Sequence, residues 1–469
     1  MSSEPCYAPR MRASFVALLA LAACAREPVL TSRPADAPRS LVIRNVRVFD
    51  APHATVLDGP RDVVVRGGRI AGVSPPGVPA PGLREIDGAG GTLLPGLIDI
   101  HAHTGTSPDP PGKVTLPDIP GNLAAFLYAG VTTVLDLGSL TPDVFRERAK
   151  VAEGKELGPH LYAAGPMFTA PGGHPAEILR ATLPWYLRWY VVPKATREVA
   201  TPDAARAAVA ALLPERPDVL KIAVDTGTDD VPRLSLEAIK AITEAGHEAG
   251  VRTMAHIGNS VEAADAIRGG VDALAHAPWR EEITDEAVAV IAAAQKPVVV
   301  TIAIGDLLEG PRKDFLPIER QVASPKLIDA LMAPSSFGGE AGERFRRAVV
   351  AGHEARRRNV TKLRAAGITI LAGSDACNPG DLPGAGLHLE LTRLVEAGMP
   401  PGEALRAATW ENARFLAGGG ADFGEVAEGK RADLVLVEGD PVADIADLGR
   451  IKQVILDGAV LERHPRPGS

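Results

Sequence analysis

The fold of this chain is decided by residues 96–103, which read GLIDIHAH. Pro95 and the glycine after it interrupt the preceding segment, and a short apolar run then leads to two histidines. Such a run is typical of a buried strand in a parallel sheet. His101 and His103 are two residues apart, so both side chains point to the same face of a strand. Two imidazoles on one face can chelate one metal ion; the alternative is a pair of polar loop residues.

Outward from this strand, the middle of the chain alternates short apolar runs with segments of helical periodicity. This alternation is typical of βα units and a parallel sheet. The candidate strands are residues 97–101, 131–137, 161–165, 218–224, 252–257, 273–277, 298–303 and 369–375. Residues 235–249 are expected to form a helix with Ser235 as its N-cap, and residues 324–366 a longer helical insertion. Eight βα units across residues 96–416 predict an α/β fold, a (β/α)8 TIM barrel.

Both ends of the chain are rich in β-forming residues instead. Residues 41–48 and 62–73 combine Val and Ile with a Gly-Gly turn, and residues 432–458 have a similar pattern. We expect the two ends to pair into one small β-sandwich domain. Residues 40–95 would be its first part and residues 417–464 its second part.

Residues 1–25 resemble a secretory signal peptide. Two arginines precede an apolar run at 15–23, which is shorter than the roughly 20 residues that cross a bilayer. The run ends at Cys24 in a pattern similar to a bacterial lipoprotein site, where the cysteine is lipidated. Simple cleavage after Ala25 is the alternative. The Pro-rich residues 26–39 are expected to act as a tether.

This N-terminus indicates an exported protein, a membrane-anchored lipoprotein of the cell envelope. A soluble periplasmic or secreted protein is the alternative. The cysteines are Cys6, Cys24 and Cys377, so after processing only Cys377 would remain unmodified and no disulfide framework is expected. The formal net charge of -8 and the lack of a basic, aromatic-rich cluster argue against nucleic acid as a partner. A small-molecule substrate is expected, with membrane contact only through the lipid, and the sequence does not reveal the oligomeric state.

Lys221 lies inside the apolar strand expected at residues 218–224. A lysine in that position is costly unless its charge is paired or removed. One interpretation pairs the ammonium with Asp225 or another acid. The other is a lysine carboxylated by CO₂, because the carbamate carries two oxygens and can bridge two metal ions.

Three further ligand-type residues follow expected strands: His256, His276 and Asp375. A lone histidine there is more often structural, and an aspartate after a serine can cap a helix. Barrel enzymes, however, build their sites at the carboxyl ends of the strands. Together with the two histidines of the first strand, these residues therefore indicate one metal-binding set, in which Asp375 is expected to be both ligand and proton shuttle.

These segments together resemble the amidohydrolase superfamily, in its binuclear subtype with a carboxylated lysine. The resemblance covers nearly the whole mature chain. It rests on residues 96–103 and on Leu220-Lys221-Ile222, Ala255-His256, Ala275-His276, Gly373-Ser374-Asp375, the helix-like 403–409 and the β-rich return at 424–434.

Within the superfamily the chain resembles the imidazolonepropionase-like and Xaa-Pro dipeptidase-like group, through residues 131–136 and Gly172-Gly173-His174. The glycine-flanked histidine of that group lies near the substrate, so the resemblance implies that His174 contacts substrate; a surface-loop role is the alternative. Two departures lie on substrate-facing loops. Residues 223–227 read AVDTG where Ser-Gly-Gly is common, and Pro175 stands where glycine is common. The group's peptide substrates therefore do not carry over directly.

The resemblance implies a metal-dependent hydrolase that cleaves a C–N amide bond of a dipeptide or an N-acyl amino acid. Two divalent ions, zinc being the best match to these ligands, would share a bridging hydroxide. One ion would be held by His101, His103 and Asp375, the other by His256 and His276, with Lys221 as N6-carboxylysine between them. A lactonase or cyclic-amide hydrolase on the same site is one alternative. A catalytically inactive surface binding lipoprotein is an alternative of another class, and Lys221 argues against a deaminase.

Overall fold

The computed structural model describes residues 29–466 apart from residues 114, 229–230 and 336–337. The expected signal segment 1–25, with Cys24, lies outside the described residues, as does the first part of the tether. In the described part of the chain, no helix is both long and apolar enough to cross a membrane.

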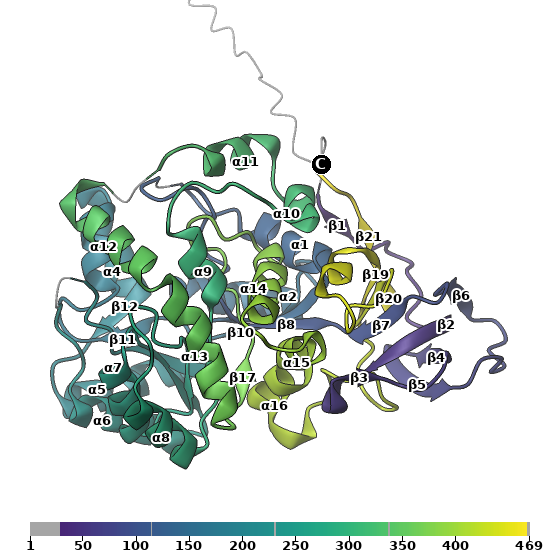
Figure 1. Ribbon diagram of the computed structural model, residues 1–469, viewed down its shortest axis with the longest axis horizontal. Coiled ribbons are helices and arrows are strands. Elements are labelled where there is room, and N and C mark those ends of the chain that lie inside the picture. The colour runs from purple at the N-terminus through teal and green to yellow at the C-terminus, as the bar shows by residue number, and fades with distance from the viewer. Residues whose placement is uncertain (1–28, 114, 229–230, 336–337, 467–469) are drawn as a thin grey trace, which may run out of the picture.

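A nine-stranded mixed sheet at one side of the molecule contains strands from both ends of the chain (Figure 1). Its central strand β2 pairs antiparallel with β4 and parallel with β7, and β7 pairs antiparallel with β18. The prediction that the two ends pair is confirmed. The strands are β2 (Leu41–Asp50), β3 (Thr55–Val56), β4 (Arg61–Arg66), β5 (Arg69–Ser74), β6 (Arg84–Asp87), β7 (Thr92–Pro95), β18 (Leu434–Val437), β19 (Ile451–Leu456) and β20 (Ala459–Val460).

A bulge in β2 explains how its apolar residues keep one buried face. Leu41 and Ile43 pack in the same apolar cluster as Val46 and Val48, although the two pairs differ in parity. The register of β2 against β4 shifts between Ile43 and Val46, and Asn45 adopts a positive φ of 52°. One extra residue at a bulge resets the alternation of side chains, so both halves of the strand face the same core.

The middle of the chain forms two parallel sheets. One has the order β10-β9-β8, and the other β12-β11-β13-β14-β15-β16-β17. Every segment predicted to be a strand contains one, while β11 and β12 were not predicted. The strands are β8 (Leu97–Ala102), β9 (Val131–Asp136), β10 (His160–Ala163), β11 (Met167–Thr169), β12 (Thr196–Glu198), β13 (Val219–Ala223), β14 (Arg252–His256), β15 (Ala273–Leu274), β16 (Val298–Val299) and β17 (Ile370–Leu371). The fold is therefore mixed α/β.

Hydrogen bonds join the three-stranded sheet to the seven-stranded sheet at both edges of the smaller one. On one side, the Asp375 amide donates to the His101 carbonyl (2.7 Å) and the Ile100 amide to the Ala372 carbonyl (3.3 Å). On the other, the amide of Asp218 donates to the carbonyl of Ala163 (2.9 Å). The carboxyl ends of β8 and β17 are thereby held side by side.

Helices cover these sheets on the outside (Figure 1). The expected helix after Ser235 is present. The hydroxyl of Ser235 caps it by accepting a hydrogen bond from the amide of Ala238 at 3.2 Å. The expected insertion contains three helices, α11 to α13. The helices are α1 (Ile119–Tyr128), α2 (Asp143–Ala152), α3 (Ala176–Thr182), α4 (Trp185–Ala195), α5 (Pro202–Leu212), α6 (Leu236–Glu248), α7 (Ser260–Arg268), α8 (Asp285–Ala294), α9 (Ile302–Leu307), α10 (Pro317–Val322), α11 (Pro325–Met332), α12 (Gly339–Ala351), α13 (His353–Ala365), α14 (Ala385–Glu396), α15 (Pro401–Arg406) and α16 (Asn412–Ala417).

The first and last described strands also pair with each other. In β1 (Thr31–Ser32) and β21 (Glu462–Arg463), Thr31 lies opposite Arg463 in an antiparallel register. The hydroxyl of Thr31 donates to the carbonyl of Ala124 in α1 at 2.8 Å. Both ends of the described chain are thus attached to the helical layer as well as to each other.

Candidate active site

The residues predicted for the site come from the carboxyl ends of several parallel strands. β8 supplies His101 and, directly after it, His103, while β13 supplies Lys221. The other residues end β14 or follow β11, β15 and β17; they are His256, His174, His276 and Asp375. The structure brings these residues into one buried group, as their distances show.

Asp375 is the centre of this group. Its Oδ1 lies 2.9 Å from His103 Nε2 and 3.3 Å from His101 Nε2. The Nζ of Lys221 lies 3.3 Å from the same nitrogen of His101. His101, Asp375 and His276 offer ligand atoms that all lie within 4.8 Å of one another. A set of two imidazoles and a carboxylate at this spacing can hold a divalent ion.

Backbone carbonyls fix which nitrogen two of the histidines present. His101 Nδ1 lies 2.9 Å from the carbonyl oxygen of Ala275, and His103 Nδ1 lies 2.9 Å from that of Gly138. A carbonyl oxygen only accepts, so each Nδ1 carries a proton. The Nε2 atoms are then the nitrogens that face Asp375. Histidine ligands of metal ions are commonly oriented in this way by a partner on their other nitrogen.

His276 and His256 lie on the far side of the group from His103. The rings of His276 and His101 are 4.7 Å apart, and those of His276 and His256 are 4.4 Å apart. His276 Nδ1 contacts the hydroxyl of Thr301 at 2.7 Å, which leaves its Nε2 free for the site. His256 instead uses Nε2, which lies 3.2 Å from Asp225 Oδ2.

His174 lies within this group rather than on a surface loop. Its ring stacks on that of His256, with centroids 4.6 Å apart and planes inclined by 23°. Its Nδ1 contacts Glu177 Oε1 at 3.1 Å, and 17% of its side chain is exposed. His174 therefore lies at the edge of the group next to His256, with part of its ring open to solvent.

Lys221 is completely buried, and none of the described carboxylate oxygens lies within ion-pair distance of its Nζ. Burial lowers the pKa of this ammonium to about 7. The alternative of an ion pair with Asp225 is not observed, because Asp225 contacts Arg280 and His256 instead. A buried lysine without a carboxylate partner is unusual unless its chemistry is changed.

The charges of the group favour metal binding. Burial lowers the pKa of His101 and of His276 well below the usual range, so both imidazoles are neutral near pH 7. Burial alone would raise the pKa of Asp375, but the nearby His101 and His103 lower it to about 2. Burial would lower the pKa of His103 as well, but its contact with Asp375 raises it. The neutral imidazoles of His101 and His276, with the ionised Asp375, are donors that suit a divalent cation. The residues present therefore fit the metal ions that the sequence implies.

Comparison of the chain with known families agrees with a metal-binding site. The model of the amidohydrolase family matches residues 92–461. This chain belongs to the amidohydrolase family. Members of the family generally use divalent metal ions, and the protein is a hydrolase that acts on C–N bonds.

Relatives of this amidohydrolase include ochratoxinase from Aspergillus niger, which is 27% identical over 385 residues, 75% of this chain and 71% of the relative. Among solved structures, a Xaa-Pro dipeptidase with bound methionine has a TM-score of 0.72 and 23% identity, over 91% of this chain and 100% of that one. A prolidase complexed with N-methylphosphonate-L-proline has a TM-score of 0.73 and 24% identity, with the same shares covered. The chain thus shares the fold of these two structures over most of its length.

Two buried aspartates that sequence reasoning missed hold this amidohydrolase site in place. Asp99 accepts hydrogen bonds from the Ser374 hydroxyl (2.5 Å) and amide (3.1 Å) and from the His101 amide (3.2 Å). It thereby joins β8 to the loop that carries Asp375, a residue with a positive φ of 73°. The other aspartate, Asp136, ends β9 and in the same way accepts hydrogen bonds from the loops beside His103. Each stands at or near a predicted strand end, a position that could have indicated its role.

Asp136 fixes the loop that orients His103. Its Oδ2 accepts from the Thr104 amide, the Thr104 hydroxyl and the Ser139 hydroxyl, all at 2.7 Å. Its Oδ1 accepts from the Gly138 amide at 3.1 Å, and the carbonyl of Gly138 is the partner of His103. A buried carboxylate with several donors is a rigid support, since each donor restricts its rotation.

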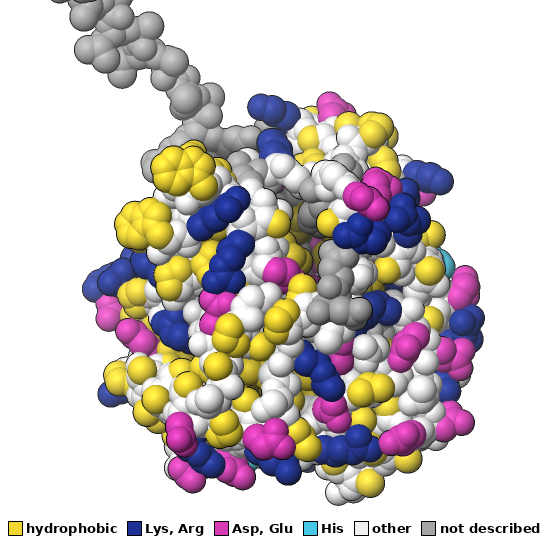
Figure 2. Space-filling model, turned by 90° about the vertical axis from the view of Figure 1, so that its left-hand side faces the viewer, with side chains coloured by type: hydrophobic (Ala, Val, Ile, Leu, Met, Phe, Trp, Pro, Cys, Tyr) yellow, Lys and Arg dark blue, Asp and Glu magenta, His cyan; other side chains and the backbone are white. Residues whose placement is uncertain are grey.

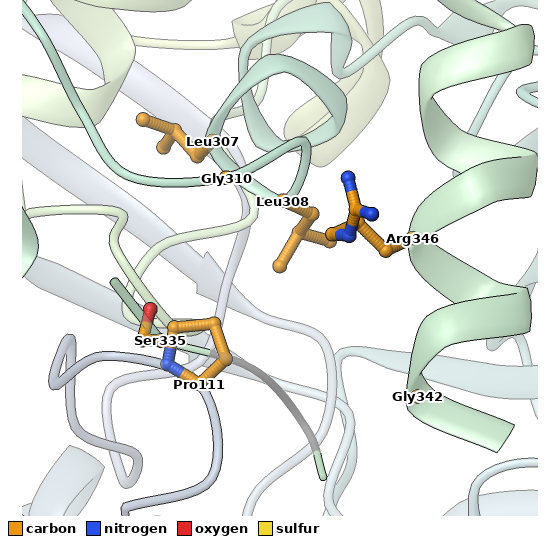
Figure 3. A pocket seen from close by; sticks show the side chains of 7 residues that line it. All are labelled: Pro111, Leu307, Leu308, Gly310, Ser335, Gly342 and Arg346. Carbon is orange, nitrogen blue, oxygen red and sulfur yellow. The ribbon is translucent and has the colours of Figure 1, made fainter. Parts of the chain in front are cut away.

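Two other features of the surface lie apart from these residues. Trp185 and Trp189 of α4 are 79% and 75% exposed, and large hydrophobic side chains stand out on the face in Figure 2. A small pocket between the loop after β8, α9 and α12 is shown in Figure 3, with Arg346 and Leu308 in its wall. None of the predicted site residues lines that pocket.

Proposed function

We propose that this amidohydrolase cleaves the C–N amide bond of a dipeptide or an N-acyl amino acid, with two divalent metal ions, zinc first among them. The observation that carries the proposal is the shared carboxylate of Asp375, within 3.3 Å of both His101 and His103, together with a buried Lys221 that contacts His101 and has no ion pair with a described carboxylate. Similarity to ochratoxinase and to Xaa-Pro dipeptidases supports the substrate class.

The ligands would divide between the two ions according to their positions. His101, His103 and Asp375 would hold one ion, and His256 and His276 the other. Lys221, carboxylated on Nζ, would bridge them. Its low pKa supports this, because the neutral amine is the form that reacts with CO₂. Such ions supply a polarised substrate carbonyl and lower the pKa of bound water to about 7.

The side chains of the protein then direct proton transfer and binding. Asp375 is ionised and lies at the centre of the group, so it can accept a proton from the attacking water and deliver it to the leaving amine. His174, at the edge of the group, is the proposed contact for the carbonyl or carboxylate of the substrate. The pKa of His174 is raised because contacts with Glu177 outweigh the effect of burial, which favours the cationic form for that role.

We also propose that the two parallel sheets form one closed (β/α)8 barrel within residues 96–416. The hydrogen bonds at both edges of the three-stranded sheet support closure. The mixed sheet formed by residues 40–95 and 417–464 would belong to the small β-sandwich domain.

We propose that the chain is exported and lipidated at Cys24, so that residues 26–39 tether the enzyme to a membrane of the cell envelope. The apolar run before Cys24 supports this. Metabolic labelling with a radioactive fatty acid tests it: label on the wild type but not on Cys24→Ala is expected. A soluble, unlabelled wild type of reduced length would instead indicate simple cleavage.

A substrate panel tests the proposed reaction. Purified protein, stripped of metal and reloaded with up to two equivalents of Zn²⁺, is offered dipeptides, N-acyl amino acids, cyclic amides and lactones. We expect amide hydrolysis that rises with the second equivalent. Turnover of lactones alone would replace the amide assignment, and loaded protein without any turnover would support the inactive binding role.

A further inference from the structure

Asp225 lies in the segment where this chain departs from the group it resembles, at the end of β13 and four residues after Lys221. Only 3% of its side chain is exposed. Its Oδ1 accepts from the Gly227 amide (2.7 Å) and from Arg280 Nη2 (2.8 Å). Its Oδ2 lies 3.2 Å from His256 Nε2 and accepts from Trp279 Nε1 at 3.3 Å. Each oxygen therefore has two partners.

The contact with His256 sets the orientation of that ring. A carboxylate paired with a guanidinium only accepts hydrogen bonds, so His256 Nε2 carries the proton and Nδ1 keeps its lone pair. His101 and His103 are fixed the opposite way, through Nδ1. Among the proposed ligands, His256 is therefore the one that a carboxylate directs to bind metal through Nδ1.

Arg280 keeps the carboxylate in place without neutralising it fully. Its Nη2 lies 2.8 Å from Asp225 and 2.9 Å from Glu262 Oε1, and the three side chains are 16% exposed or less. One guanidinium is thus shared between two buried carboxylates. Glu262 is held independently by the amides of Thr226, Gly258 and Asn259. The two carboxylates of Asp225 and Glu262 together carry one more negative charge than Arg280 neutralises. A metal ion bound to His256 would balance it.

The backbone is shaped to allow this arrangement. A Cβ atom at Gly258 would lie 2.6 Å from Arg280 Nη2 and 2.7 Å from Asp225 Oδ1, so a side chain there would displace this pair. The amide of Trp279 donates to the carbonyl of Gly258 at 3.2 Å. The ends of β13 and β14 and the loop after β15 therefore meet at one carboxylate.

We propose that Asp225 is a positioning residue that holds His256 with Nδ1 toward the site, and that one of the two metal ions depends on it. This inference rests on the proposed binuclear site, and Asp225 is not one of the proposed metal ligands. A carboxylate that accepts from a metal-bound histidine orients the ring and raises its basicity, and its loss typically weakens metal affinity by about 10–100-fold.

The test uses Asp225→Asn in the full chain. The amide keeps the shape but can offer its NH₂ to His256 Nε2, which favours the tautomer with the proton on Nδ1. Asp272→Asn is the matched control, because Asp272 accepts from the His247 ring at 2.8 Å in the same way, before β15 and away from the site. Asp225→Ser removes the carboxylate without adding an amide, and serves if the Asn variant does not fold.

Metal content after dialysis against a weak chelator, and the visible spectrum after loading with Co²⁺, are the readouts. We expect two ions per chain in the wild type and in Asp272→Asn. We expect one tightly held ion, a second bound about 10–100-fold more weakly, and a reduced Co²⁺ spectrum in the Asp225 variants. A circular dichroism spectrum like that of the wild type shows that these variants are folded.

The outcomes separate this inference from the proposed function. A wild type that hydrolyses amides, together with Asp225 variants that keep two ions at wild-type affinity, would overturn the positioning role and leave the function standing. A wild type that retains no metal and hydrolyses no substrate would overturn both. Equal losses in Asp272→Asn would also overturn the positioning role, since they would reflect general destabilisation.

Discussion

The two roles proposed for Asp375, metal ligand and proton acceptor, are compatible in its surroundings. Its oxygen reaches both His101 and His103, and its amide donates to the His101 carbonyl, so the side chain is held on a positive-φ turn. A group that both binds metal and moves a proton must stay ionised in a buried place, and the adjacent histidines provide this. A substitution of Asp375 should therefore affect metal binding and turnover to different extents.

For Asp375→Asn we expect metal to be partly retained but turnover to fall by at least about 100-fold, the usual contribution of a general base. The amide oxygen still coordinates, but it accepts no proton. Metal content and the hydrolysis rate, measured on the same sample, check this. Near-normal turnover would rule out proton transfer by Asp375.

Lys221→Ala tests the bridge between the ions. Removing the side chain leaves a buried space beside His101 and takes away two carbamate oxygens, so we expect metal content and amide hydrolysis to fall together. A mass increase of one CO₂ on Lys221 of the intact wild type, absent from the variant, provides direct evidence. Full activity with two ions bound in Lys221→Ala would exclude the bridging role.

At the scale of elements, the strands that carry the site are short and depend on side chains to hold them together. Asn412, at the start of α16, donates from Nδ2 to the carbonyls of Ile98 (2.8 Å) and Ala372 (2.7 Å). It therefore joins β8 to the end of β17, and its side chain is completely buried.

Asn412→Leu removes both donors and nearly keeps the size of the side chain. The carbonyls of Ile98 and Ala372 each lose one donor, and Ala372 keeps the Ile100 amide. At about 1–3 kcal/mol for each lost bond, we expect the free energy of unfolding to fall by roughly 2–6 kcal/mol. Urea unfolding of the metal-free protein measures this. A loss below about 1 kcal/mol would show that the two strands do not depend on this side chain.

The positions of the parallel strands could be predicted from sequence, but not their extents. The run expected at residues 298–303 forms a strand only over Val298–Val299, because Thr301 turns at a positive φ of 46° to reach His276. At β17, the amide of Ser374 bonds to Asp99 rather than to a strand. Apolar residues predict burial, and it is the polar contacts of the site that end the strands.

That the proposed ligand residues lie together could be predicted, because their types are chemically distinctive and their positions recur at strand ends. For Asp99, Asp136 and Asp225 a position near a strand end was not enough, because an aspartate has many structural roles and some of its partners are distant in sequence. Ser374, for example, reaches Asp99 across 275 residues. Three-residue strands such as β11 are also too short to show a period.

At the scale of the whole molecule, one histidine joins the end sheet to the parallel strands. His160 begins β10, and its Nε2 lies 3.2 Å from Asp433 and 3.4 Å from Asp457, which flank β18 and β19. Burial alone would lower the pKa of His160, but these two carboxylates raise it to about 9. The contact with His160 lowers the pKa of Asp457.

This histidine predicts a pH-dependent stability. Because its pKa is higher in the folded protein than in the unfolded chain, its contribution is complete below about pH 6.5 and is lost as the pH rises through about 9. The contribution is at most about 3 kcal/mol. Unfolding at pH 6 and pH 9.5 should therefore differ less in His160→Gln than in the wild type. An unchanged difference would place the pH dependence elsewhere.

The pairing of β1 with β21 has a consequence for the time at which the protein can fold. A chain emerging from the ribosome exposes Thr31 long before its partner Arg463 exists, and β7 likewise waits for β18. Contacts of such long sequence separation form late, since the loop must close first. The nascent chain therefore stays without its finished end sheet until synthesis is complete. In the export proposed above, this delay would leave the end sheet unformed while the chain enters a translocation channel.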